Sequence, residues 1–184
     1  MIGAQIFLAG LLASNTTIYD AQRVPPSQTL CSPAIAIPAG LDLWKVAYER
    51  VQDHQYTAAA RAYYQLFRCG ERGWTPINPL VSDYNQLQPF DAALRAATEG
   101  RFRAASTGLN QILKVMPRFG EARFLMGVFQ WTGGTRDEAR ATWRSTITAP
   151  YFTQPPDSDG TPRVVTEAAK FLWWATASWG ATAH

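Results

Sequence analysis

One pattern of residues occurs twice in this chain, 34 positions apart, and it limits the possible folds more than any other feature. The segment EGRFRAASTGLNQIL (99–113) aligns with GGTRDEARATWRSTI (133–147). The matched pairs are Gly100 with Gly134, Ala105 with Ala139, Leu109 with Trp143 and Leu113 with Ile147. Glycine tolerates the positive φ of a tight turn, and a small alanine lets two helices approach closely. The pattern therefore predicts helix–turn–helix units that pack against one another.

A third copy of the pattern lies upstream. The segment HQYTAAARAYYQLF (54–67) aligns at a shift of 46 residues, which pairs Tyr56 with Phe102, Ala59 with Ala105 and Tyr63 with Leu109. The longer shift implies an insertion, which we assign to the stretch 69–80 because it contains Gly, Pro and Asn. His54 stands where the other two copies have glycine.

Helical spacing of apolar residues covers most of the chain from residue 41 onward. It predicts helices at 41–51, 56–67, 90–98, 102–115, 121–131, 136–146 and 163–178. The helix from Phe90 is expected to be short, because Pro89 precedes it. No useful stretch alternates with a period of two. We therefore expect an all-α fold with at least five helices in antiparallel pairs, with turns at about 53–55, 99–101 and 132–135.

A helix–turn–helix period of 34 residues with these glycines and alanines resembles the tetratricopeptide repeat family. The resemblance covers about residues 41–148. The matching residues are Leu43, Val46, Ala47, Tyr56, Ala59 and Tyr63, then Gly100, Phe102, Ala105, Leu109 and Pro117, then Met126, Gly127, Gly134, Ala139 and Trp143. It implies a short α-solenoid of antiparallel helix pairs. Residues 1–40 would form an apolar segment and an extended arm outside the repeats, and residues 149–184 a loop and a C-terminal capping helix.

In this family the first helix of each pair lines a concave groove. The resemblance assigns seven residues to that groove as candidate partner-binding residues: Trp44, Tyr48, Phe90, Leu94, Phe124, Val128 and Trp131. An exposed groove this apolar would be a large adhesive patch, which monomers rarely tolerate. Two alternatives follow. The chain covers the groove itself, with the segment 33–40 or the last helix, or an apolar peptide or helix from a partner binds there.

The last predicted helix has an apolar face too wide for a cap that packs on one side only. Its candidate partner-binding residues are Phe171, Trp173, Trp174 and Trp179. They would contact the groove, a partner subunit or a membrane interface, where tryptophan is favoured. Only Arg163 and Lys170 are cations in this helix, which weakens the membrane-surface alternative.

Residues 1–40 hold a short apolar run followed by a proline-rich arm. The run 2–13 has the length of a signal-peptide core and is too short to span a bilayer. However, no Lys or Arg precedes it and no A-x-A site follows it. We therefore expect an uncleaved export or anchoring segment, or a buried N-terminal arm. Four prolines predict extended chain without a helix over 15–40.

The two cysteines, Cys31 and Cys69, form no zinc-binding or redox motif. They are compatible with one disulfide in an oxidising compartment, or with two unrelated thiols. If the chain is exported, we expect them to pair and to tie the arm to the end of the second helix. The expected location is extracytoplasmic (periplasmic), with membrane association through the N-terminal segment. A cytoplasmic location is the alternative.

Nothing in the sequence points to catalysis. Motifs for nucleophile elbows, phosphate loops, dinucleotides and zinc proteases do not occur, and the two histidines lie in a predicted turn and at the last position. We expect no catalytic residue, metal or cofactor. A diffuse net charge of +3 gives no reason to expect nucleic acid.

The expected function is a non-enzymatic protein–protein interaction scaffold, an accessory subunit of a larger membrane-associated extracytoplasmic complex. The alternative is a helical ligand-binding protein or enzyme with a pocket in the apolar groove.

Overall fold

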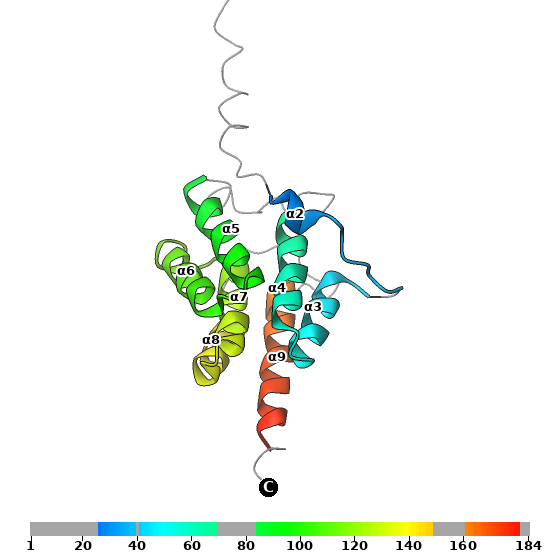
Figure 1. Cartoon of the computed structure of the whole chain (residues 1–184). Helices are drawn as coiled ribbons and strands as arrows, with labels where there is room; N and C mark the ends of the chain where they lie inside the picture. Colours follow the sequence, from blue (N-terminus) through cyan, green and yellow to red (C-terminus); the bar gives the residue numbers. More distant parts are fainter. Residues whose placement is uncertain (1–25, 40, 70–83, 149–160, 181–184) are drawn as a thin grey trace, which may run out of the picture.

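The computed structural model describes residues 26–39, 41–69, 84–148 and 161–180, and within these residues it contains helices and no strand. Figure 1 shows their arrangement. The helices are α2 (Gln28–Cys31), α3 (Leu43–Gln52), α4 (Tyr56–Tyr64), which continues as a π-helical turn (Gln65–Cys69), α5 (Tyr84–Thr98), α6 (Phe102–Val115), α7 (Gly120–Thr132), α8 (Arg136–Thr148) and α9 (Arg163–Gly180). The predicted all-α fold is confirmed.

The helices from α3 to α9 lie where the spacing predicts them, with one substantial difference. Helix α5 begins at Tyr84 and not at Phe90, so Pro89 lies inside it. Proline lacks only the N–H that would bond to the carbonyl of Asn85, four residues earlier. One helical turn can therefore precede it, and the prediction of a short helix after Pro89 was wrong.

Three turns of the same geometry join α3 to α4, α5 to α6 and α7 to α8. Each contains one residue with positive φ: His54 at 61°, Gly100 at 79° and Gly134 at 93°. In each turn the next backbone N–H bonds to the carbonyl five residues earlier, from Gln55 to Arg50 at 2.8 Å, from Arg101 to Ala96 at 2.9 Å and from Thr135 to Gln130 at 2.9 Å. These are the bonds of a Schellman C-cap. The turns lie at the predicted positions, and His54 adopts the backbone conformation that glycine adopts in the other two.

Each helix from α3 to α8 packs against the next one along the chain, and α9 also packs against α7. Small residues lie at the closest approaches. The alanines at the three matched positions, Ala59, Ala105 and Ala139, are at most 1% exposed. On α7, a Cβ added to Gly127 would lie 2.4 Å from the indole Nε1 of Trp143 on α8. The repeated small residues therefore let bulky aromatic side chains fill the space between helices.

The arm is held against α4 by a disulfide and by one buried amide. Cys31 and Cys69 form a disulfide with a Cα–Cα distance of 5.4 Å, as predicted. The Gln65 side chain accepts a hydrogen bond from the Ile35 N–H at 2.7 Å and donates to the Leu30 carbonyl at 3.1 Å. The arm also contains the single turn α2, so the prediction of a helix-free arm was wrong for these four residues. The prolines flank this turn and do not interrupt it.

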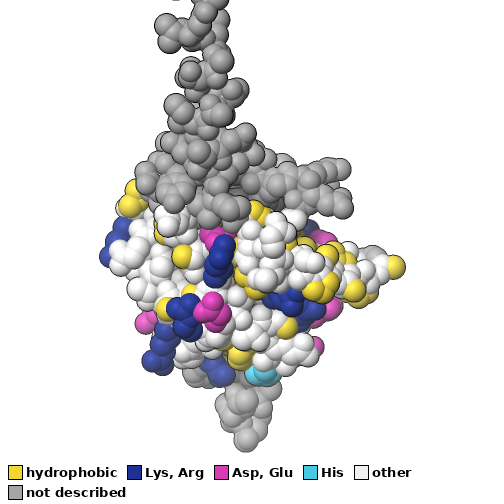
Figure 2. All heavy atoms as spheres, turned by 45° about the horizontal axis from the view of Figure 1, so that its top comes forward, with side chains coloured by type: hydrophobic (Ala, Val, Ile, Leu, Met, Phe, Trp, Pro, Cys, Tyr) yellow, Lys and Arg dark blue, Asp and Glu magenta, His cyan; other side chains and the backbone are white. Residues whose placement is uncertain are grey.

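Downstream of α2 the arm is extended. Figure 2 shows its hydrophobic side chains gathered on a projection at the right of the view, whereas charged side chains are scattered over the rest of that face. Within the described part of the chain, no helix is both long enough and apolar enough to cross a membrane. The apolar run 2–13 and most of the predicted insertion lie outside the described residues.

Candidate interaction surface

The seven residues assigned to the groove do come together, but they are covered. Six of them are buried and Tyr48 is half-buried. Helix α9 covers the part of this face that α3 and α7 contribute, because the Phe171 ring lies 4.9 Å from the ring of Tyr48 and 5.7 Å from that of Phe124, and the Trp174 ring lies 5.1 Å from that of Trp131. Phe90 on α5 packs instead against Phe67 and Phe119. Of the occupants considered from the sequence, the structure therefore has the last helix on this face.

The other occupant considered, the segment 33–40, lies elsewhere. Its described residues follow α4, where the carbonyl of Pro33 accepts hydrogen bonds from Gln65 Nε2 at 3.2 Å and Arg61 at 3.3 Å. Most of them are exposed, and Ile37 is 46% exposed. This segment does not fill the groove because these hydrogen bonds, together with the disulfide, hold it along α4 and the π-helical turn.

Helix α9 has a buried face and an exposed face, and they separate its tryptophans. Phe171 is fully buried. Trp174 is half-buried and packs edge-on against Phe171 at 6.2 Å between ring centroids. Trp173 points outward and is 72% exposed. The side chain of Trp179 lies outside the described residues. Among the predicted residues of this helix, Trp173 is thus the described one that is free to contact a partner.

The residues four positions before and after Trp173 on its own helix are small, and Lys170, three positions before it, is paired with Glu167. Ala169 and Ala177, one turn before and one turn after it, are both exposed alanines. Side chains four positions apart on a helix are neighbours, so these alanines cover little of the indole, which stays 72% exposed. Among the described side chains, the other exposed large hydrophobic ones, Ile37 and Val115, lie on the arm and at the end of α6.

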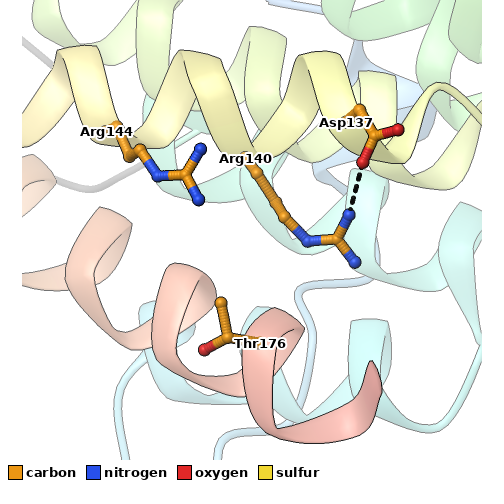
Figure 3. A pocket seen from close by; sticks show the side chains of 4 residues that line it. All are labelled: Asp137, Arg140, Arg144 and Thr176. Atoms are coloured by element: carbon orange, nitrogen blue, oxygen red, sulfur yellow. Dashed lines mark hydrogen bonds and ion pairs between the residues drawn. The ribbon is translucent and has the colours of Figure 1, made fainter. Parts of the chain in front are cut away.

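A shallow pocket of about 400 Å³ lies between α8 and α9, lined by Asp137, Arg140, Arg144 and Thr176 (Figure 3). Thr176 stands three residues after Trp173, so the pocket adjoins the exposed indole. The two arginines reach from α8 toward α9. Neither arginine is among the site residues predicted from the sequence. The sequence does contain a signal for them, because Arg136, Arg140 and Arg144 are spaced four residues apart. This spacing puts all three on one face of α8.

The two pocket arginines have different surroundings. Arg140 is buried, and it donates to Asp137 at 2.7 Å and to the carbonyl of Ala175 on α9 at 3.4 Å. Its guanidinium carbon also lies 5.5 Å from the ring centroid of Trp131. The hydrogen bond to Ala175 joins α8 to α9, and the contact with Trp131 joins α8 to α7. Arg144 is exposed, and its guanidinium forms no hydrogen bond or ion pair with any described residue.

Two buried carboxylates elsewhere in the core are compensated within the chain. Their ion pairs are Asp91 with Arg68 and Arg95, and Glu167 with Arg163 and Lys170. Burial, and then the charge of Glu167, raise the pKa of the Tyr63 phenol well above its usual value. The Asp91–Arg68 pair joins α5 to the π-helical turn, whereas both pairs of Glu167 lie within α9. The described residues contain no cluster of His, Cys, Asp or Glu that could hold a metal ion.

No family model, curated protein or solved structure matches the chain.

Proposed function

We propose that this chain is a non-enzymatic interaction scaffold built on tetratricopeptide-like helix pairs, and that the outer face of α9 is its docking surface. The observation that carries the proposal is Trp173, a large aromatic side chain left 72% exposed on a chain that buries most of its other described aromatic side chains. Tryptophan is enriched among the residues that dominate binding energy at protein interfaces. Exposing it to water without a partner is unfavourable.

The repeat interpretation is supported by the three equivalent turns. They share a residue with positive φ, the same backbone hydrogen bond and a buried alanine five residues after the positive-φ residue, and they lie 46 and 34 residues apart. In a solenoid each unit contacts its neighbours, and terminal units need a cap. Helix α9 would act as that cap, since it covers the apolar faces of α3 and α7.

The disulfide supports an extracytoplasmic, periplasmic location, because disulfides persist in oxidising compartments and are rare in the cytosol. We propose on this basis that the chain is an accessory subunit of a membrane-associated extracytoplasmic assembly. The alternative function, a ligand pocket or an active site in the apolar groove, has less support, because side chains of α9 occupy that face.

The test is the size of the native assembly that contains the chain. Full-length parent and Trp173→Ser protein are purified from the native source under mild conditions and run on a sizing column, with circular dichroism as the folding control. We expect the parent in a large complex and the Trp173→Ser chain as a free monomer. Val115→Ser, which removes another exposed hydrophobic side chain, at the end of α6, should behave as the parent.

Trp174→Ser separates docking from folding. Because Trp174 packs against Trp131 and Phe171, we expect this variant to lower the melting temperature. A parent chain that runs as a free monomer would contradict the proposal. So would a folded Trp173→Ser chain that stays in the complex.

A further inference from the structure

We propose that the pocket between α8 and α9 binds a single carboxylate on a partner protein, an Asp or Glu side chain next to an apolar residue that packs on Trp173. This inference rests on the proposed function, because it uses the same face of α9. It identifies the partner as an acidic, apolar peptide segment.

The charge of the pocket favours an anion. Its lining contains two guanidinium groups and one carboxylate, which leaves one net positive charge. Arg140 is already engaged with Asp137 and with the carbonyl of Ala175. Arg144 has all of its donors directed to solvent or into the pocket, with no partner among the described residues. Two parallel N–H donors of a guanidinium match the two oxygens of a carboxylate.

The charges and free hydrogen-bond donors of the pocket favour a singly charged ligand group over a phosphate. Asp137 is 90% exposed at its side chain and stays at the rim of the pocket, where it would repel a dianion more strongly than a carboxylate. The hydroxyl of Thr176 donates within its own helix, to the carbonyls of Leu172 and Trp173 at 3.0 and 2.8 Å. It therefore offers no free donor for a third oxygen. Arg144 supplies the new hydrogen bonds, and one carboxylate satisfies them.

The apolar part of the proposed ligand follows from the register of the two helices. Arg140 contacts Ala175, and Trp143 contacts Phe171 at 5.1 Å, so α8 and α9 run antiparallel. Arg144 therefore lies opposite the turn of α9 that carries Leu172 and Trp173. A peptide that placed its carboxylate on Arg144 would place a neighbouring side chain on the uncovered indole.

The experiment selects random short peptides displayed on phage against the immobilised full-length, oxidised chain. We expect the enriched peptides to carry Asp or Glu beside an aromatic or aliphatic residue. Synthetic copies should bind the Arg144→Glu chain about tenfold more weakly or worse. A peptide with the acid changed to its amide should bind the parent equally weakly. Lys114→Glu makes the same change of charge at an exposed site on α6 and should bind as the parent.

The outcomes distinguish the two proposals. Two results would overturn the proposed carboxylate ligand and leave the docking surface intact. One is a set of enriched peptides that need Trp173 but carry no acidic residue. The other is a set of acidic peptides that bind the Arg144→Glu chain as tightly as the parent. If no selected peptide depends on Trp173 for binding, both the carboxylate ligand and the docking surface would be overturned.

A lipid headgroup is the other source of an anion for this pocket. It is tested by comparing co-sedimentation of the chain with phosphatidylglycerol vesicles and with phosphatidylcholine vesicles. Sedimentation with the anionic vesicles that Arg144→Glu abolishes would reassign the pocket to a membrane surface and overturn the inference.

Discussion

Replacing Gly127 by alanine tests the helix packing at the point where it is tightest. The new Cβ would lie 2.4 Å from Nε1, 2.6 Å from Cδ1 and 3.0 Å from Cε2 of Trp143. Contacts this short require a displacement, and the indole has little room to move. It is fully buried, with the rings of Trp131 at 5.9 Å and Phe171 at 5.1 Å.

Two effects of opposite sign determine how much Gly127→Ala changes the free energy of unfolding. Alanine is intrinsically better than glycine inside a helix by about 1 kcal/mol. Overpacking a core that cannot relax costs about 1–3 kcal/mol, and more where the neighbour is a rigid ring. We therefore expect Gly127→Ala to lower the free energy of unfolding by about 1–2 kcal/mol. For a chain of this length that corresponds to a fall in melting temperature of about 2–8 °C.

The matched control is Gly108→Ala on α6. Its Cβ would meet the Cβ of Ala93 at 3.4 Å, which is ordinary van der Waals contact, so the helix-propensity gain should dominate and stabilise the chain by up to about 1 kcal/mol. Urea unfolding followed by circular dichroism measures both variants. In a Trp143→Leu background, Gly127→Ala should lose most of its cost, because the two sites are in contact. A Gly127→Ala chain as stable as the parent would refute the packing of α7 on α8 described above.

Three further predictions concern stability. Ala105→Leu and Ala139→Leu should each cost about 1–3 kcal/mol by overpacking a helix crossing, and unchanged melting temperatures for both would count against the repeat alignment. Replacing Cys31 and Cys69 by serine should lower the free energy of unfolding in urea by about 4 kcal/mol, because the disulfide closes a loop between residues 38 positions apart. Two alkylatable thiols in protein from its native compartment would instead reject the disulfide. Burial raises the pKa of Tyr63 above its unfolded value near 10. The free energy of unfolding should therefore hold below about pH 10 and fall as the pH rises toward the folded pKa. An equally steep fall in the Tyr63→Phe chain would show that Tyr63 is not the group responsible.

Local signals in the sequence were sufficient for the presence of the helices α3 to α9, for the turns and for the small residues at the crossings, although they missed α2 and the first turn of α5. Gly100 and Gly134 mark turns because a positive φ is strained in most other residues. The alignment of the upstream copy, at a shift of 46 residues, then places His54 at the same position, although histidine by itself indicates no such turn. Ala105 and Ala139 are recognisable as crossing residues because they recur with those turns. Each of these properties depends on a few neighbouring residues, so the sequence expresses it directly.

The candidate site depends on contacts between segments far apart in the chain, and periodicity carries no information about them. Helix α9 and the segment 33–40 are both apolar, and the sequence offered either as cover for the groove. The disulfide and Gln65 hold the segment on α4, which leaves the groove to α9. Trp173 and Trp174 are adjacent and chemically identical, yet one is exposed and the other packs against Trp131, because α9 meets the other helices along only one face. That rotation of α9, and the pocket where Arg144 meets it, follow from how the whole core packs, and only the tertiary structure decides them.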